Sequence, residues 1–129
     1  MCAPFAANDR PVDGVSELNK LKVRLFVDAV WNEGEIELVD DLVGADYVGR
    51  FPCVEGAVRG PAGVRLLVAK HRLANPDLYI KIEDQIAEGD RVVTRWRATG
   101  RTAPRAGISI IRLLAGKQVD SHTERWLNS

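Results

Sequence analysis

The feature that most constrains the fold of this chain is the stretch from Glu88 to Asn128, which reads as three consecutive strands. Its apolar and polar residues tend to alternate, and such alternation is typical of strands because successive side chains point to opposite faces of a sheet. The predicted strands are Arg91–Gly100, Ala106–Ala115 and Lys117–Leu127. Short turns separate them, so they are expected to be antiparallel neighbours.

Three helices are expected before these strands. The first begins at Ser16 and ends near Asn32, and its apolar residues share one face: Leu18, Leu21, Leu25, Phe26, Ala29 and Val30. A short second helix is predicted over Glu35–Val43. The third begins at Pro61, and it places Val64, Leu67, Val68 and His71 on one stripe.

Two further strands are expected at Ala45–Phe51 and Leu78–Ala87, with a loop over Val54–Gly60. Helices first and an antiparallel meander afterwards are typical of an α+β fold. We therefore predict a curved antiparallel sheet packed on three N-terminal helices. A sheet wrapped around helices in this way encloses a pocket, and such pockets usually hold small molecules.

Length and charge narrow the class of protein. With 129 residues the chain is expected to form one domain over residues 15–129, preceded by a loose arm over residues 1–14. Its 18 basic and 18 acidic residues balance, which argues against nucleic acid or an anionic membrane as partner. No apolar run is long enough to cross a bilayer, and no signal-peptide pattern is present. Two cysteines form no disulfide framework, so a cytoplasmic location is expected.

The run VDAVWNEGEIELVDDLVGADYVGR, Val27 to Arg50, resembles the opening of the SnoaL-like polyketide cyclases, a family of the nuclear transport factor 2-like superfamily. The resemblance continues through Arg59–Gly100 and resumes at Gly107–Val119, so it covers most of the chain from about Val15. It implies a conical α+β barrel, in which three helices close a strongly bent antiparallel sheet. It also implies a deep apolar cavity and a homodimer.

The resemblance implies a function as well. SnoaL-like cyclases close a ring by aldol condensation, with an aspartate as acid/base and no metal or organic cofactor. Limonene epoxide hydrolase and ketosteroid isomerase, on the same architecture, also use carboxylates in the cavity. We therefore expect cofactor-independent cyclase, isomerase or hydrolase chemistry on a small carbonyl, epoxide or cyclic compound. Because this superfamily hosts many functions, a small-ligand-binding module without catalysis and a structural dimer with a filled cavity remain open.

Three departures from the family pattern bear on the chemistry. Only Arg101 to Ala106 joins the last two strand blocks, where relatives carry a longer segment, so a wider cavity mouth is expected. The final stretch reads GKQVDSHTERW, which puts His122 near the place of a family tryptophan. Glu124 falls at or near the carboxylate position of the epoxide hydrolase, although a shift of one residue would move that match to Thr123. Arg50 stands where many relatives have a histidine.

Glu124 and His122 are the first catalytic candidates, because alternation places them on one face of the last strand with Asp120 and Trp126. If that face lines the cavity, the Glu124 carboxyl is suited to acid/base work and His122 would share its proton. Alternatively, both lie past the lip of the barrel in water. His71 is the third candidate, although a histidine on an apolar stripe is also a common core residue.

Five residues are expected to shape the ligand pocket: Trp31, Tyr47, Thr94, Trp96 and Trp126. Plain core packing is the alternative for the aromatic ones. Cys53 would need an adjacent base to act as a nucleophile, and the sequence identifies none. His71, His122 and Glu124 would suit a two-histidine, one-carboxylate metal site. No short-spaced ligand motif supports that site, so neither a metal nor another cofactor is expected.

The strand over Ala106–Ala115 also predicts an association. Ile108 and Ile110 fall on the face opposite Ser109, Ile111 and Leu113, so both faces of this strand carry apolar side chains. The helices can cover only one of these faces. We therefore expect a second copy of the chain to cover the other, in a two-fold homodimer through the sheet.

Overall fold

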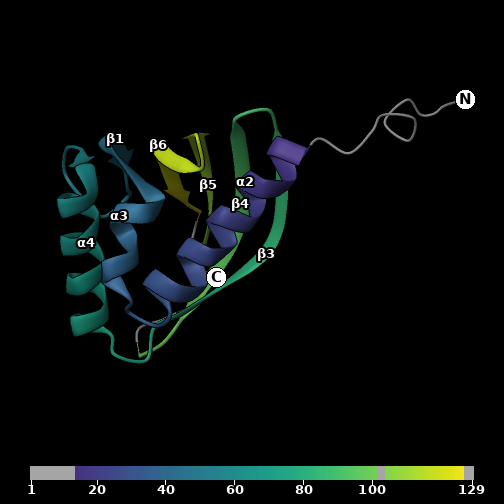
Figure 1. Cartoon of the computed structure of the whole chain (residues 1–129). Helices are drawn as coiled ribbons and strands as arrows, with labels where there is room; N and C mark the ends of the chain where they lie inside the picture. Colours follow the sequence, from purple (N-terminus) through teal and green to yellow (C-terminus); the bar gives the residue numbers. More distant parts are fainter. Residues whose placement is uncertain (1–13, 102–103, 127–129) are drawn as a thin grey trace, which may run out of the picture.

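The computed structural model describes residues 14–101 and 104–126, and it contains a curved six-stranded sheet with the helices on one side (Figure 1). The strand order across the sheet is β2-β1-β6-β5-β4-β3. The strands are β1 (Val43–Arg50), β2 (Val58–Arg59), β3 (Tyr79–Glu88), β4 (Arg91–Thr99), β5 (Arg105–Leu114) and β6 (Lys117–Arg125). The predicted three-stranded meander is therefore present as β4, β5 and β6.

The helical segments follow the predicted order too. They are α2 (Gly14–Leu25), the π-helical turn η1 (Phe26–Trp31), the 3-10 turn η2 (Ile36–Leu38), α3 (Val39–Leu42) and α4 (Gly60–Ala74). Pro61 lies in the first turn of α4, where its missing N–H breaks no helical hydrogen bond. The α+β prediction is confirmed. The expected arm, apart from Gly14, lies outside the described residues, as do Leu127 and part of the turn after Arg101.

The sheet differs from the prediction in two respects. It is not wholly antiparallel, because β1 and β6 run parallel, with Val48 opposite Asp120. It is also not a closed barrel, since β2 and β3 form its two edges without pairing with each other. The predicted loop after Val54 contains the short strand β2, which pairs antiparallel with β1.

The first helix packs only in part on the predicted face: Phe26 and Val30 are buried as expected, but the leucines are not. Leu18, Leu21 and Leu25 are exposed, whereas Val23, Phe26 and Val30 are buried together with the polar Ser16 and Asn19. Asn19 can be buried because its Nδ2 donates to the backbone oxygen of Gly89. The helix carries apolar residues on two stripes, and periodicity alone does not show which stripe meets the sheet.

The segment after η1 is anchored by side-chain hydrogen bonds. Asn32 Oδ1 accepts the N–H of Ile80 at 2.7 Å, and its Nδ2 donates to the oxygen of Ile80 at 2.8 Å. Arg72 donates from α4 to the backbone oxygens of Trp31 and Asn32. These bonds satisfy carbonyl groups that the end of a helix leaves without partners. They also fix η1 against both β3 and α4.

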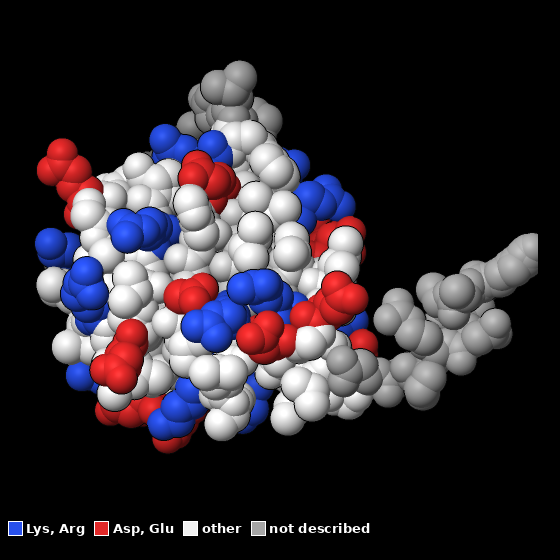
Figure 2. Space-filling model, turned by 90° about the horizontal axis from the view of Figure 1, so that it is seen from above, with Lys and Arg blue, Asp and Glu red and all other residues white. Residues whose placement is uncertain are grey.

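The surface carries no single dominant charge on the face that Figure 2 shows, where basic and acidic side chains are interspersed. This mixture agrees with the net charge of zero. None of the helices in the described part of the chain is long and apolar enough to cross a membrane.

Candidate functional site

A pocket of about 140 Å³ lies between the helices and the inner face of the sheet. Three groups of residues line it. The helical side supplies Val23, Phe26, Val27, Trp31, Leu67 and His71, and the first strand and the loop after it supply Tyr47, Phe51, Pro52 and Cys53. The remaining strands and the turn before β3 supply Leu78, Ile80, Thr94, Trp96, Ala98, Arg105, Ser109, Ile111, Gln118, Ser121, Thr123 and Arg125. Most of this lining is apolar, with a few polar groups at defined places.

Strand register builds the inner wall in rows. Thr94 pairs with Ser109, which pairs with Thr123, and all three line the pocket. The next row contains Trp96 and Gly107. A Cβ at position 107 would collide with the backbone oxygen of Glu124 and would lie 2.5 Å from the Trp96 ring, so only glycine leaves room for both. The indole therefore packs next to the backbone of Gly107.

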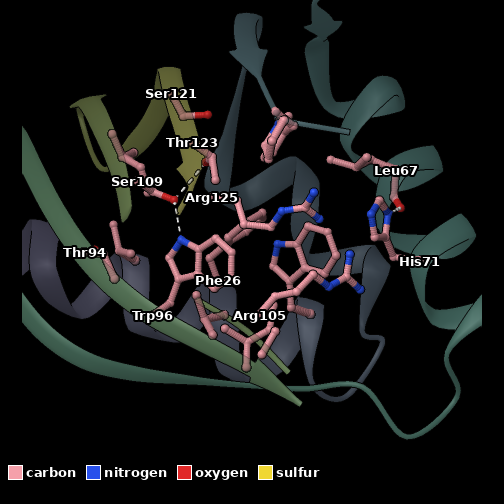
Figure 3. A pocket seen from close by; sticks show the side chains of 18 of the residues that line it. Phe26, Leu67, His71, Thr94, Trp96, Arg105, Ser109, Ser121, Thr123 and Arg125 are labelled. Carbon is pink, nitrogen blue, oxygen red and sulfur yellow. Dashed lines mark hydrogen bonds between the residues drawn. The ribbon is translucent and has the colours of Figure 1, made fainter. Parts of the chain in front are cut away.

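A chain of hydrogen bonds runs along this wall (Figure 3). Trp96 Nε1–H donates to Ser109 Oγ at 3.1 Å, and Ser109 Oγ lies 2.8 Å from Thr123 Oγ1. The indole can only donate, so Ser109 accepts from it. The three groups hold three protons and these two bonds use two of them. One hydroxyl proton is thus left to donate to a ligand.

Tyr47 forms the second polar contact of the wall. Its hydroxyl lies 2.5 Å from Ser121 Oγ, and a Cβ at Gly49 would collide with that hydroxyl. Burial raises the pKa of Tyr47 to about 12, the Ser121 hydrogen bond lowers it in part, and the charge of Asp120 raises it further. Tyr47 therefore stays protonated at neutral pH, and its ring lines the pocket while its hydroxyl remains uncharged.

His71 reaches the pocket from α4. Its Nδ1 lies 3.0 Å from the backbone oxygen of Leu67, and its Nε2 lies 3.5 Å from Cys53 Sγ. A carbonyl oxygen only accepts, so Nδ1 carries the proton of the neutral ring and Nε2 keeps a lone pair. The Trp31 ring packs edge-on against the imidazole, with centroids 5.6 Å apart. The orientation and the tautomer of His71 are both fixed in this way.

Two arginines complete the pocket. Figure 3 shows Arg105 and Arg125 reaching from the strands into the region between Trp96 and His71. No Asp or Glu of the described chain lines the pocket. A neutral protein thus contains a site whose fixed charges are positive, and such a site favours a ligand that carries or develops negative charge.

The structure contradicts the predicted placement of Glu124, His122 and Trp126. Glu124 and His122 do share a face, and His122 Nε2 lies 2.6 Å from Glu124 Oε2. That face is the outer one, where their side chains are 68% and 57% exposed. Trp126 is also exposed and does not line the pocket.

A bulge in β6 explains the inversion. Leu113 pairs with Gln118 while Arg112 pairs with Asp120, so Val119 is an extra residue. Gln118 points inward, and without the bulge the inward residues after it would be Asp120, His122 and Glu124. The extra residue reverses the alternation, so Ser121 and Thr123 point inward instead.

The other predicted site residues do line the pocket: Trp31, Tyr47, His71, Thr94 and Trp96. Ser109 was not predicted as a site residue, and Thr123 was named only as the alternative to Glu124, although the register opposite Thr94 would have indicated both. The partner of Cys53 was not predicted either. His71 lines the pocket whereas His122 and Glu124 lie outside it, so the three cannot form one metal site. Within residues 14–101 and 104–126, no group of three potential ligands is close enough to hold a metal ion.

The chain is an α+β protein with a pocket between its helices and its sheet, and comparison with known proteins identifies the family. The model of the SnoaL-like polyketide cyclase family matches residues 21–120, so the chain belongs to this family. No curated protein sequence shows significant similarity to the chain.

Several solved structures share the fold. A protein from Jannaschia sp. CCS1, assigned as a SnoaL-like polyketide cyclase, is 17% identical with a TM-score of 0.80, and the match covers 91% of both chains. IdmH from Streptomyces antibioticus, assigned as a polyketide cyclase, is 20% identical with a TM-score of 0.74, over 84% of this chain and 91% of IdmH. A protein from Kribbella flavida DSM 17836, assigned as a ketosteroid isomerase, is 14% identical with a TM-score of 0.77, over 88% and 82%.

Proposed function

We propose that the protein catalyses cofactor-independent acid/base chemistry of the cyclase or isomerase type on a small, largely apolar carbonyl compound. The observation that carries this proposal is the contact of His71 Nδ1 with the Leu67 carbonyl, which fixes the tautomer of the neutral ring and leaves the lone pair on Nε2 at the pocket wall. Aldol cyclisation and double-bond isomerisation both begin with removal of a proton from a carbon next to a carbonyl. The family and the assigned functions of its structural neighbours support the same class of reaction.

In the proposed step, Nε2 of His71 accepts the proton and the electron pair of the broken C–H bond moves to the carbonyl oxygen. The resulting enolate is negative, and the guanidinium groups of Arg105 and Arg125 favour it electrostatically. The hydroxyl groups of Ser109 and Thr123 lie on the side of the pocket opposite His71 in Figure 3, where they would bind a second oxygen of the ligand. The outward Glu124 and His122 have no role in this step.

The second candidate function is binding without catalysis. It is favoured by the lining, because no described carboxylate faces the pocket and the family chemistry relies on one. In that case the apolar wall and the two arginines would hold a hydrophobic anion, and His71 would serve only as a hydrogen-bonding group.

The two functions are separated by measuring exchange and binding on the same compounds. The protein is incubated in D2O with cyclic ketones and cyclic diketones, and exchange of the protons next to each carbonyl is followed by NMR. Binding is followed by the fluorescence of the tryptophans, two of which line the pocket. Catalysis predicts exchange above the buffer rate for compounds that bind, whereas binding that never accelerates exchange would refute the enzymatic proposal.

His71→Gln tests the role of the base. We expect it to slow exchange by about a hundredfold or more, the range of a lost general base, while ligand affinity changes by less than about tenfold. The matched control is His122→Gln, which removes the other histidine of the chain from the exposed outer face. It is expected to leave both measurements unchanged. A native exchange rate in His71→Gln would exclude His71 as the base.

We also propose a two-fold dimer through the outer face of the sheet. Ile110 remains 46% exposed there, and Ile86 is 66% exposed on β3. Such side chains on a sheet are costly in water unless another surface covers them. A second copy that presents the same face would cover them symmetrically.

A further inference from the structure

The pocket wall beside His71 carries a reactive group that the proposed acid/base step does not use. Cys53 lies in the loop between β1 and β2, lines the pocket and is exposed at its edge. Because Nδ1 of His71 donates to the Leu67 carbonyl, Nε2 of the neutral ring can only accept. In the 3.5 Å contact between Cys53 Sγ and His71 Nε2, the thiol is therefore the donor. This arrangement contains a nucleophile, an adjacent base and a group that orients the base.

We propose that Cys53 is a nucleophile, with His71 as its base, that adds to α,β-unsaturated carbonyl compounds bound in the pocket. The inference does not rest on turnover by His71, because addition requires only that the thiol lose its proton to Nε2 while a ligand occupies the pocket. The proposal gives Cys53 a covalent role, whereas the acid/base step does not use this residue.

The surroundings of the pair favour a carbon electrophile conjugated to a carbonyl. Trp31, Phe51 and Leu67 form apolar walls that suit an unsaturated ring or chain. Arg105 and Arg125 line the same pocket, where they can stabilise the oxyanion that forms when a nucleophile adds to an enone. Cys53 is also reachable from solvent, so a ligand can approach the sulfur without the loop opening.

The step balances without any further reactant. The thiol proton moves to Nε2 of His71, and the thiolate sulfur attacks the carbon β to the carbonyl. A C–S bond forms as the π pair of the C=C bond moves through the conjugated system to the carbonyl oxygen, giving an enolate. The imidazolium then returns its proton to the α-carbon. The net change is addition of S–H across the double bond, with nothing oxidised or reduced.

The test uses the full chain and cyclohexenone at pH 7, with adducts at each cysteine quantified over time by peptide mass spectrometry. Cys2 of the same chain serves as the internal reference thiol. We expect Cys53 to react at least about tenfold faster than Cys2, because a positioned base contributes that much or more. His71→Gln should bring the rate at Cys53 to within about threefold of the rate at Cys2, and His122→Gln should change neither.

Equal rates at Cys53 and Cys2 in the native protein would overturn the proposal without recourse to any variant. A fast Cys53 whose rate is unchanged in a folded His71→Gln variant, checked by circular dichroism, would overturn the role of the imidazole. The native protein separates this inference from the proposed function, because adduct formation at Cys53 and exchange of ketone protons in D2O are measured independently. An adduct without exchange leaves this inference standing and refutes only the acid/base proposal, whereas exchange without a fast adduct overturns only this inference.

Discussion

Asn32 provides the sharpest test of how the pocket is held together. Its side chain lies against the edge of β3 and binds both the N–H and the carbonyl oxygen of Ile80, at 2.7 and 2.8 Å. It thus acts as a one-residue substitute for a neighbouring strand. Ile80 and Trp31, which directly precedes Asn32, both line the pocket. Removing the amide should therefore loosen one wall.

We predict that Asn32→Ala lowers the free energy of unfolding by about 2–3 kcal/mol. Each lost hydrogen bond accounts for about 1 kcal/mol, and leaving partly buried backbone groups without partners adds to this. For a domain of this size that loss corresponds to a drop in Tm of roughly 10 °C. Thermal and urea unfolding followed by circular dichroism measure both quantities. A loss below about 0.5 kcal/mol, the usual range of a neutral surface substitution, would show that the Asn32 amide does not hold β3 in place.

Asn32→Asp is the matched control for the geometry. At neutral pH the introduced carboxylate still accepts from the Ile80 N–H, but its other oxygen faces the Ile80 carbonyl oxygen. At acidic pH the protonated carboxyl can donate to that oxygen. The folded state then binds the proton more tightly than the unfolded state, so stability relative to Asn32→Ala should rise as pH falls. No such rise would mean that the second hydrogen bond contributes nothing.

Three other predictions concern the walls and the outer face. Gly107→Ala should displace both the Trp96 ring and the backbone at Glu124, cost about 1–3 kcal/mol and change tryptophan fluorescence; an unchanged spectrum and stability would contradict the packing. Because the pKa of Tyr47 is raised to about 12, folding should lose stability between pH 10 and 12 as the unfolded chain ionises, by up to about 1.4 kcal/mol per pH unit. Tyr47→Phe should lose the Ser121 hydrogen bond and abolish this decline; an equal decline in both proteins would exclude Tyr47 as its source. Sedimentation at tens of micromolar should show a dimer that Ile110→Asp converts to a folded monomer, whereas a native monomer would exclude the proposed interface.

Much of the fold could be predicted from the sequence because local patterns determine it. The order of the helices and strands follows from periodicity and from breakers such as Pro61 and Gly89. Alternation puts Thr94 and Trp96 on one face of β4 and Arg95 and Arg97 on the other, and this contrast in polarity indicates which face is inward. The parallel pairing of β1 with β6 joins strands distant in the chain, and no local pattern specifies it.

The candidate site was harder to predict from the sequence, because a single residue can change which side chains face the pocket. One extra residue in β6, Val119, reverses the face on which every later side chain lies. The pair of Glu124 and His122 was predicted correctly as a contact and incorrectly as part of the cavity. The base near Cys53 belongs to a helix 18 residues further along the chain, so only the folded structure brings the two together.

The proposed function requires that the ligand meets His71 inside the pocket and does not meet His122 on the outer face. The chain has only two histidines, so NMR of the 15N-labelled imidazoles gives two sets of signals, which His71→Gln and His122→Gln assign. Without ligand, we predict that the neutral His71 ring carries its proton on Nδ1. Titration with a cyclic diketone that binds should shift the Nε2 signal of His71 and leave His122 unmoved. A ligand-dependent shift confined to His122 would show that the ligand does not bind in the pocket beside His71.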